Sequence, residues 1–158
     1  MTIVGEGPER GALEQLAESL GLAPHVRFTG GLPFEAVIGH LEASDALVLA
    51  SETEGWPKSL AEGMAFGLAC IGSTIGFVPE MLQGRGLAVP PRDEDALTAA
   101  LAKIAESPDR LAPMRRAAAD WAQRYSLEGL KDALRALMEE WWAPGAWPLA
   151  GAPREMAE

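Results

Sequence analysis

The chain has 158 residues, of which 48% are hydrophobic and 23% charged, a composition that excludes a disordered or fibrous protein and suits one folded domain. Its formal net charge is −10, and its largest basic cluster is the pair Arg115 and Arg116, so we expect no binding to nucleic acid. No apolar run approaches the roughly 20 residues of a membrane span, and no secretory signal precedes the first predicted strand, which together predict a cytoplasmic protein.

The first part of the chain alternates short β-like runs with amphipathic helical runs. The run Thr2–Val4 leads through a glycine-rich turn at residues 5–8 into a helical pattern that ends near Gly21. The apolar face of that helix is formed by Leu13, Leu16, Ala17 and Leu20. A second strand at residues 25–28 and a turn at 29–31 lead to a helix opened by Pro33, whose stripe contains Val37, Ile38 and Leu41.

The next strand, at residues 46–50, is apolar at every position, as expected for a strand covered on both faces of a parallel sheet. A loop at 51–55 then leads into a helix that begins at Pro57 and stops at Gly67. Two further strands are predicted at residues 69–72 and 86–89, with a turn between them at 76–80. The single cysteine, Cys70, lies in this apolar surrounding, so we expect a buried core thiol rather than a nucleophile.

The C-terminal part is predicted to be helical. Asp93 caps a helix that runs to about residue 105, Pro108 opens another towards Tyr125, and Ser126 begins a final helix. That last helix carries the apolar stripe Leu127, Leu130, Leu134, Leu137 and Trp141. Residues 143–158 are rich in Pro, Gly and Ala and are expected to form an unstructured tail.

This order of elements predicts an α/β fold, a doubly wound, Rossmann-like parallel sheet with flanking helices, over residues 1–142. Ligands of such folds bind at the carboxyl ends of the strands. The loop at 51–55 follows the most apolar strand, and the first turn of the helix behind it offers unpartnered N–H groups and a positive dipole end. We therefore expect an anion such as a diphosphate at this helix start.

Three charged side chains surround the predicted anion site. Lys58 either contacts the phosphate or forms an i,i+4 surface pair with Glu62, and the residues alone favour neither alternative. The carboxylates of Glu54 and Glu62 would repel a diphosphate, but they suit the hydroxyl groups of a sugar and a ribose. A nucleotide sugar carries such hydroxyls on both sides of its diphosphate.

The run EGWPKSLAEGMAFG, residues 54–67, resembles the signature of retaining nucleotide-sugar glycosyltransferases of group 1, in which two glutamates are separated by seven residues. Four flanking segments agree with this resemblance: IVGEGPE at 3–9, VRFTG at 26–30, GFVPE at 76–80 and GLAVP at 86–90. Together they span about residues 2–142. The resemblance implies the C-terminal, donor-binding domain of a GT-B fold, which has two Rossmann-like domains.

The resemblance also implies a role for each site residue. Glu54 contacts the transferred sugar as the catalytic residue, Glu62 holds the ribose hydroxyls, and the backbone near Leu32 meets the base. The diphosphate is expected at the loop and helix start, on Gly55, Trp56, Pro57, Lys58 and Ser59. The family needs no metal and no cofactor besides its donor, a UDP-, GDP- or ADP-linked sugar, and neither His25 nor His40 has a partner at metal-ligand spacing.

The resemblance further implies parts that this chain lacks: a first strand and helix with an Arg and a Lys for the diphosphate, and the acceptor-binding domain before them. An acceptor domain or partner chain is therefore expected as a partner, and the isolated chain is expected to be inactive. The acceptor would be a glycan or a lipid-linked glycan, which leaves peripheral membrane association of the full enzyme open. The missing first strand is central in the family's sheet, so either its two neighbours close on each other or another chain or segment fills the space. We expect closure of the strand at 2–4 directly onto the strand at 46–50.

A second hypothesis assigns no chemistry to the chain. It would be a catalytically silent nucleotide-sugar-binding or protein-interaction module that docks a partner through Leu134, Leu137 and Trp141. A stripe of this kind usually packs on the core of its own domain. Hydrolysis or transfer of a nucleotide sugar by the chain alone would separate the two hypotheses.

Overall fold

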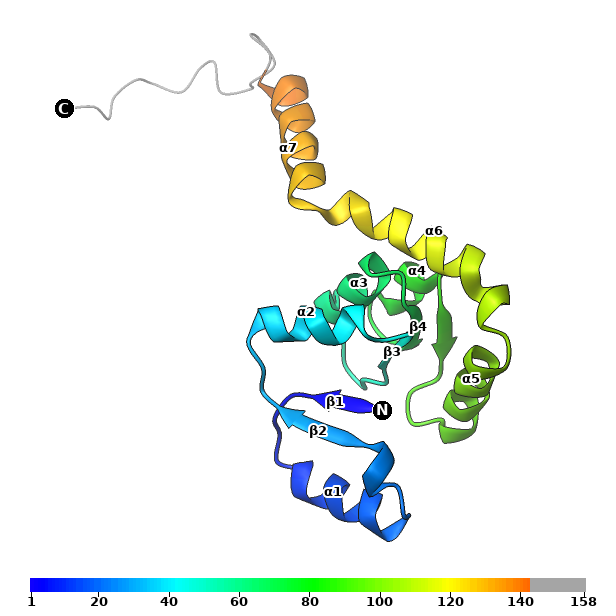
Figure 1. The fold of residues 1–158 in the computed structure, drawn as a ribbon. Helices are drawn as coiled ribbons and strands as arrows, with labels where there is room; N and C mark the ends of the chain where they lie inside the picture. The colour runs from blue at the N-terminus through cyan, green and yellow to red at the C-terminus, as the bar shows by residue number, and fades with distance from the viewer. Residues whose placement is uncertain (143–158) are drawn as a thin grey trace, which may run out of the picture. The chain divides into compact units, whose positions relative to one another are not determined.

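The computed structural model describes residues 1–142 (Figure 1). The predicted tail at 143–158 lies outside the described residues. The chain divides into two compact units, Met1–Asp45 and the part from Ala46 onward, and each is described by itself. The extent of the predicted domain, residues 1–142, stays a prediction.

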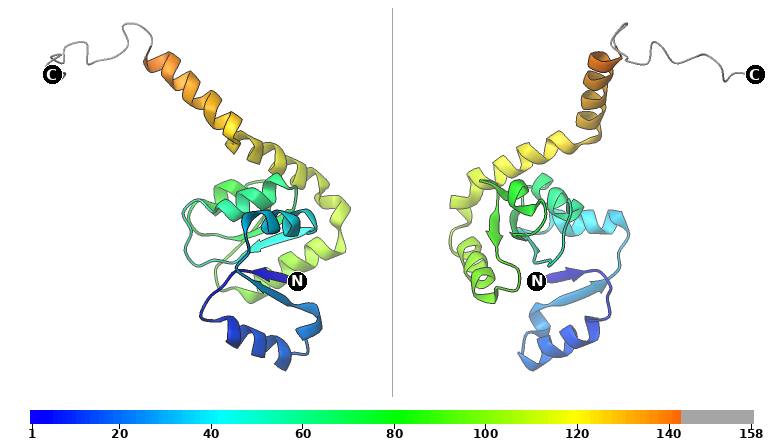
Figure 2. Two further views of the ribbon diagram at one scale, coloured as in Figure 1. Left: turned by 60° about the vertical axis from the view of Figure 1, so that its left-hand side comes forward. Right: turned by 180° about the vertical axis from the view of Figure 1, so that it is seen from behind.

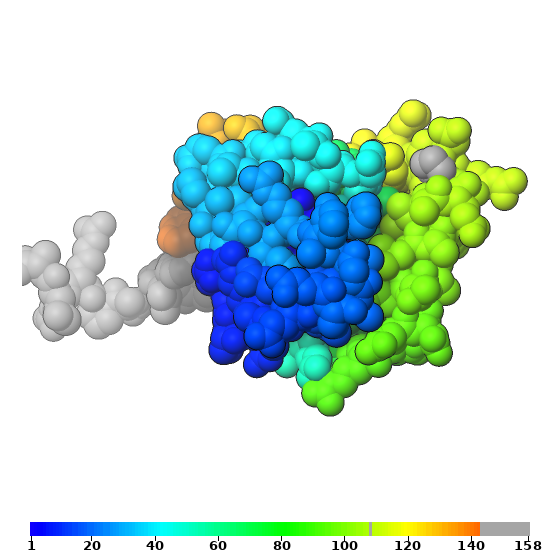
Figure 3. Space-filling view, turned by 60° about the horizontal axis from the view of Figure 1, so that its bottom comes forward, coloured from blue at the N-terminus to red at the C-terminus, as the bar shows by residue number. Residues whose placement is uncertain are grey.

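The N-terminal unit contains two parallel strands, β1 (Thr2–Val4) and β2 (Arg27–Gly30). Between them lie α1 (Arg10–Ser19) and the short 3₁₀ helix η1 (Ala23–His25), and α2 (Phe34–Glu42) follows β2. Figure 3 shows the surface of this unit in blue and cyan. Of the apolar face predicted for the first helix, only Ala17 is buried.

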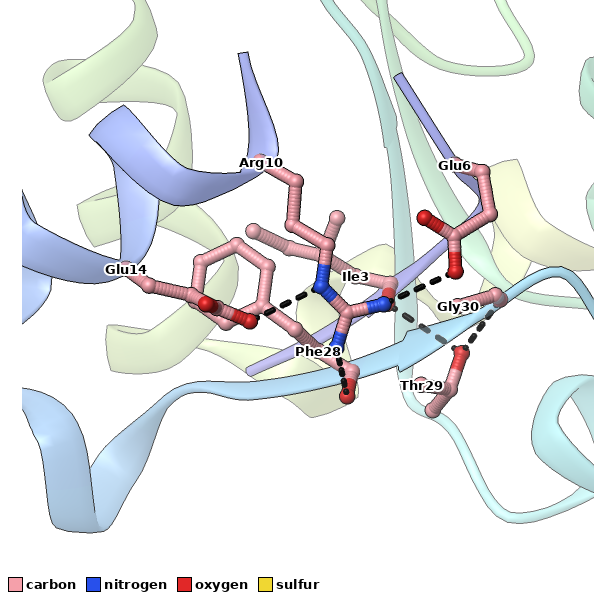
Figure 4. Close-up of polar contacts among 7 residues, drawn as sticks. All are labelled: Ile3, Glu6, Arg10, Glu14, Phe28, Thr29 and Gly30. Atoms are coloured by element: carbon pink, nitrogen blue, oxygen red, sulfur yellow. Dashed lines mark hydrogen bonds and ion pairs between the residues drawn. The ribbon is translucent and has the colours of Figure 1, made fainter. Parts of the chain in front are cut away.

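A network around Arg10 ties the three parts of this unit together (Figure 4). The Arg10 guanidinium donates to Glu6 Oε1 at 2.9 Å, to Glu14 Oε1 at 2.8 Å and to the Phe28 carbonyl at 3.5 Å. It therefore joins the turn after β1, the body of α1 and strand β2. Gly30 ends β2 with φ +74°, a backbone conformation that favours glycine over any residue with a side chain.

The C-terminal unit contains three parallel strands in the order β3 (Ala46–Leu49), β4 (Ala69–Ser73) and β5 (Leu87–Val89). Helix α3 (Lys58–Ala65) connects β3 to β4, and α4 (Val78–Leu82) connects β4 to β5. The strand buried along its whole length is β4, whereas Val48 of β3 is exposed. The prediction that the strand at 46–50 is covered on both faces is therefore wrong for Val48.

The core of this unit lies on both faces of β4, because successive strand residues point to opposite sides. On one face, a Cβ at Gly72 would meet Val78 and Leu82 of α4 and Leu60 of α3. On the other face, Ile71 packs with Val89 and with α5, through Ala100 and Leu97. Helices α3 and α4 thus cover one face of β4, and α5 covers the other.

Cys70 is fully buried in this core, as predicted. Burial raises the pKa of its thiol to about 12, against a smaller opposing effect of the positive charge of Arg115. Because the thiolate is the reactive form, this cysteine is inert at neutral pH.

Two of the helices after β5 begin at the predicted caps, whereas the α-helix expected to open at Pro108 begins at Ala112, after a 3₁₀ turn. Asp93 Oδ1 accepts from the Ala96 N–H at 2.8 Å at the start of α5 (Glu94–Glu106). Helix α6 (Ala112–Ala122) lies between the 3₁₀ helices η2 (Pro108–Leu111) and η3 (Gln123–Tyr125), and Arg115 donates to the Gly67 carbonyl at 2.6 Å, which ties α6 to the end of α3. Ser126 Oγ accepts from the Gly129 N–H at 3.1 Å and caps α7 (Leu127–Trp141).

Helix α7 (orange in Figure 2) runs away from the sheet of its own unit, and its main contacts are with η3. The side chains of its apolar stripe are between 50% and 80% exposed: Leu127, Leu130, Leu134, Leu137, Met138 and Trp141. The usual packing of such a stripe on its own core is therefore not found here. Within residues 1–142, no helix is long and apolar enough to cross a membrane.

Two expectations about the sheet and its connections are wrong. Strand β1 pairs with β2 and strand β3 with β4, and no ladder joins β1 to β3 among the described residues, so the predicted closure does not occur. The segment at 76–80, predicted as a turn, contains the start of helix α4, whose Pro79 lies in the first turn. Proline suits that position because its missing N–H would have had no helical partner.

Candidate functional site

The loop at residues 51–55 and the start of α3 lie at the carboxyl end of β3, as predicted. Pro57 is the N-cap of α3 with extended backbone and makes no side-chain capping bond, and no acidic residue stands in the first turn. Two side chains of this helix, Leu60 and Met64, are fully buried and pack it onto the core. The first turn of α3 is therefore supported by buried side chains and begins without a side-chain cap from its own N-cap residue.

Two hydrogen bonds from the next strand and helix fix the two ends of this loop. Ser73, fully buried at the end of β4, donates its hydroxyl to the Ser51 carbonyl at 2.5 Å. The Phe77 N–H donates to the Gly55 carbonyl at 3.0 Å. The loop is thus anchored at its first and last residues to the segment that leads from β4 to α4.

Gly76 permits the closest approach between the two segments. Its φ is +58°, and a Cβ built there would lie 1.9 Å from the Glu54 carbonyl oxygen. Both the backbone conformation and the lack of space exclude a side chain. The motif GFVPE, noted in the sequence as one of the flanking segments, therefore packs against the backbone of Glu54.

A third anchor comes from the loop after β5. Arg92 donates from both sides of its guanidinium to Glu52, Nε to Oε1 at 2.6 Å and Nη2 to Oε2 at 2.5 Å. This hydrogen bond is the main cause of the lowered pKa of Glu52 and of the raised pKa of Arg92. Since the carboxyl pKa is lowered in the folded state, the pair stabilises the fold above the ordinary carboxyl range and is lost as the pH falls through the folded pKa.

The two predicted glutamates lie on either side of the helix start. Glu62, in the second turn of α3, forms an ion pair with Lys58 across 3.2 Å, and its side chain is 24% exposed. The i,i+4 pair considered in the sequence is therefore formed. Glu54 is half-buried, and no ion-pair partner is found for it in the part of the chain that the structure describes.

Trp56 joins the loop to the junction of α6 and α7. Its ring lies 5.3 Å from that of Tyr125 in a tilted arrangement, and Tyr125 in turn lies 4.6 Å from Trp121. The guanidinium of Arg85 lies over the Trp121 ring at 5.0 Å. Such ring pairs add roughly 0.5–1.5 kcal/mol beyond the area that they bury.

The structure brings together seven of the eight predicted site residues: Glu54, Gly55, Trp56, Pro57, Lys58, Ser59 and Glu62. The eighth, Leu32, follows β2 in the N-terminal unit, and its predicted role at the base stays a prediction. Within residues 1–142, no three His, Cys, Asp or Glu side chains gather in a way that could hold a metal ion.

The residues that support the loop were not predicted from the sequence. Ser73, Gly76 and Arg92 stand 22 to 40 positions from their partners, and no local pattern links such distant positions. One signal was present, since Gly76 begins a segment that carries the family resemblance, and a glycine in such a segment indicates a close backbone approach. Arg92 gave no such signal.

The chain matches the family described as "Glycosyl transferases group 1" over residues 1–121. It therefore belongs to this family, and it corresponds to the C-terminal, donor-binding domain of the GT-B fold.

Relatives of known activity cover this domain as part of longer chains. A GDP-mannose-dependent alpha-(1-6)-phosphatidylinositol monomannoside mannosyltransferase of Mycolicibacterium smegmatis is 34% identical over 131 residues, 77% of this chain and 34% of the relative. A 2-deoxystreptamine N-acetyl-D-glucosaminyltransferase of Streptomyces fradiae is 33% identical over 135 residues, 84% of this chain and 32% of the relative. The chain thus spans about a third of the length of these relatives.

Solved structures share the fold. Sucrose-phosphate synthase from Thermosynechococcus elongatus matches 90% of this chain and 38% of its own, with a TM-score of 0.77 and 25% identity. The Anabaena protein HepE in complex with UDP-glucose matches 87% of this chain and 40% of its own, with a TM-score of 0.76 and 21% identity. Both likenesses agree with an α/β domain of parallel strands and flanking helices.

Proposed function

We propose that this chain binds a nucleotide diphosphate sugar, as the donor of a retaining, metal-independent transfer to a glycan or lipid-linked glycan. The observation that carries the proposal is the joint geometry of the loop at 51–55 and the start of α3. Two carboxylates flank a helix start that has no side-chain cap and no acidic first-turn residue. That arrangement suits a ligand whose diphosphate stands between two hydroxyl-bearing rings.

The diphosphate is proposed to lie on the backbone of Gly55, Trp56, Pro57, Lys58 and Ser59. Proline has no N–H, so its contribution is the fixed extended backbone that aims the following amides outward. Lys58 already pairs with Glu62, and it can still reach an incoming phosphate because its side chain is 77% exposed. The three anchors of the loop would keep these groups in place before the ligand arrives.

The two glutamates are proposed to accept hydrogen bonds from hydroxyl groups. Glu62 would hold the ribose, and Glu54, as the catalytic residue, would contact the transferred sugar. A carboxylate that accepts a hydroxyl proton forms a charge-assisted bond, which is roughly twice as strong as a neutral one. The partial burial of both side chains favours this role over that of solvated surface residues.

The donor is proposed to be a UDP-, GDP- or ADP-linked sugar, with no choice made among the three bases or among sugars. The mannosyltransferase named above is GDP-mannose-dependent, whereas HepE was solved with UDP-glucose. The backbone near Leu32 is the proposed contact for the base.

We further propose that the apolar face of α7 docks an acceptor-binding domain, in the same polypeptide or in a partner chain. The chain alone is proposed not to catalyse sugar transfer. The exposure of Leu134, Leu137 and Trp141 supports this docking. The same observation favours the second candidate, a catalytically silent binding or interaction module. A cytoplasmic location, with peripheral membrane association of the full enzyme, fits either candidate.

Calorimetric titration with UDP, GDP and ADP, without added metal, tests the donor site. We expect one of them to bind, and Glu62→Ala to weaken it by about 1.5–3 kcal/mol, the value of a hydrogen bond to a charged group. Glu139→Ala, which removes an exposed carboxylate of α7, is the matched control and should leave the affinity unchanged. Absence of binding by all three nucleotides, or equal affinity in Glu62→Ala, would overturn the proposal.

A second variant decides between the two roles of Lys58. If the ammonium contacts the phosphate, Lys58→Ala weakens nucleotide binding and makes it less sensitive to salt. If its role is the pair with Glu62 alone, the same variant leaves the affinity nearly unchanged. UDP-, GDP- and ADP-linked sugars then serve to test transfer and hydrolysis by the chain alone, and rapid multiple turnover would contradict its expected inactivity.

A further inference from the structure

Arg92 and Glu52 form a bridge across the ligand edge of the C-terminal unit. Glu52 follows β3 and Arg92 follows β5, with β4 between these two strands. Since neighbouring strands lie about 4.8 Å apart, the two strand ends are separated by roughly 10 Å. The long guanidinium side chain spans this separation and contacts both carboxylate oxygens of Glu52, at 2.6 and 2.5 Å.

The stability of the fold does not explain this arrangement. Arg92 has φ +59° and is the only residue other than glycine with a positive φ in the described part of the chain. For an L residue this conformation is unfavourable. The side chains of Arg92 and Glu52 are 77% and 56% exposed, and an exposed ion pair contributes little to stability. Strained residues of this kind persist where their surroundings fix them, and they cluster at functional sites.

The bridge completes the support of the loop. Ser73 holds the carbonyl of Ser51, and the Phe77 N–H holds the carbonyl of Gly55. Glu52 lies between these two anchors, two positions before Glu54. Without Arg92, residues 52–54 would be held among the hydrogen bonds described above only by the bonds at the two ends of the loop, from Ser73 to Ser51 and from Phe77 to Gly55.

The bridge also balances charge. Glu52, Glu54 and Glu62 place three carboxylates around a site proposed for a dianionic ligand. Arg92 offsets Glu52, and Lys58 offsets Glu62. Two explanations therefore exist for Arg92, one geometric and one electrostatic, and they predict different effects when Glu52 is removed.

We propose that Arg92 is a positioning residue for the donor site, which acts through Glu52 to hold the loop at 51–55 in the geometry that binds the ligand. The effect on nucleotide binding rests on the proposed function, whereas the claim that Arg92 holds the loop does not. Its consequence is that loss of either partner loosens the loop and weakens nucleotide binding, although loss of Glu52 also removes a negative charge.

The test compares Arg92→Gly, Glu52→Ala and the double variant with the wild type. Glycine suits the positive φ, so Arg92→Gly removes the bridge and relieves the backbone. Asp132→Ala, which breaks the exposed pair of Arg135 and Asp132 on α7, is the matched control. The first measurement is amide hydrogen exchange of Phe77 by NMR in the absence of ligand, because this N–H is bonded to Gly55 of the loop. The second is the affinity for the nucleotide diphosphate, and the third is the melting temperature.

We expect the Phe77 amide to exchange faster in both single variants, and nucleotide affinity to fall by roughly threefold to tenfold in each. The double variant should show no further loss, since the two residues act as one unit. The melting temperature should not fall in Arg92→Gly, and Asp132→Ala should match the wild type.

Two results would overturn the proposal. Unchanged exchange at Phe77 in both variants would mean that the bridge does not hold the loop. Tighter nucleotide binding in Glu52→Ala, together with weaker binding in Arg92→Gly, would mean that Arg92 acts through its charge. If the wild type binds no nucleotide, the proposed function fails, and the exchange measurement still decides whether Arg92 holds the loop.

Discussion

The loop at 51–55 and helix α7 differ in how the rest of the molecule supports them. The loop receives a hydroxyl from β4, an N–H from the start of α4 and a guanidinium from beyond β5. Helix α7 has a good N-cap and an apolar stripe, yet that stripe is exposed. The difference teaches that local sequence signals create an element, whereas contacts between distant residues decide whether it becomes part of a rigid site.

The largest loss of stability is expected from a substitution in the core that supports α3. Leu60 is fully buried, and Leu60→Ala should reduce the free energy of unfolding by about 2–5 kcal/mol, through lost burial and the cavity left behind. Urea denaturation measures this loss. A change below that range would mean that the support of α3 is less tightly packed than the structure indicates.

Gly76→Ala should cause the next largest loss in the free energy of unfolding. A left-handed φ costs an L residue roughly 1–2 kcal/mol, and the overlap with the Glu54 carbonyl adds about 1–3 kcal/mol. Gly84→Ala is the matched control, since its φ is +69° but a Cβ there meets nothing within 4 Å. Equal losses in the two variants, measured by urea denaturation, would show that the close approach to Glu54 has no energetic weight.

Ser73→Ala removes one anchor of the loop without leaving a large cavity. The lost hydrogen bond to the Ser51 carbonyl should reduce the free energy of unfolding by about 1 kcal/mol. Amide exchange of Phe77 should rise in the same variant, because the remaining contacts hold the loop less firmly. Wild-type stability and exchange together would contradict the role of Ser73 as an anchor.

The smallest effect is expected on α7. Leu134 is half-exposed, so Leu134→Ala should change the free energy of unfolding by no more than about 0.5 kcal/mol. This variant mirrors Leu60→Ala in chemistry and differs from it in surroundings. A loss as large as that of Leu60→Ala would mean that the face of α7 is covered in solution, and the contrast between the two regions would disappear.

Much of the fold could be predicted because its signals are local. The caps Asp93 and Ser126, the helix entry at Pro57 and the stop at Gly67 all lie within a few residues of the elements that they define. The five strands were found for the same reason. Helix α4 was missed because it has only five residues and begins with a segment that reads as a turn.

The pairing of strands and the support of the site could not be predicted in this way. The expected closure of β1 on β3 assumed that unpaired edges in one sheet must meet, whereas the strands form two separate sheets. The bridge between Arg92 and Glu52 depends on two strand ends being brought together by β4, and nothing in either local sequence indicates it. The motif at 54–62 predicted the candidate residues, but not what holds them.

The central claim is that the start of α3 and its two glutamates form a donor site, and a crystal structure with the nucleotide diphosphate that binds in calorimetry tests it most directly. We predict that diphosphate oxygens lie within hydrogen-bonding distance of the backbone N–H groups of residues 55–59, with the ribose hydroxyls on the Glu62 carboxylate. A nucleotide bound elsewhere, or one that leaves both the α3 start and Glu62 without contact, would contradict the account.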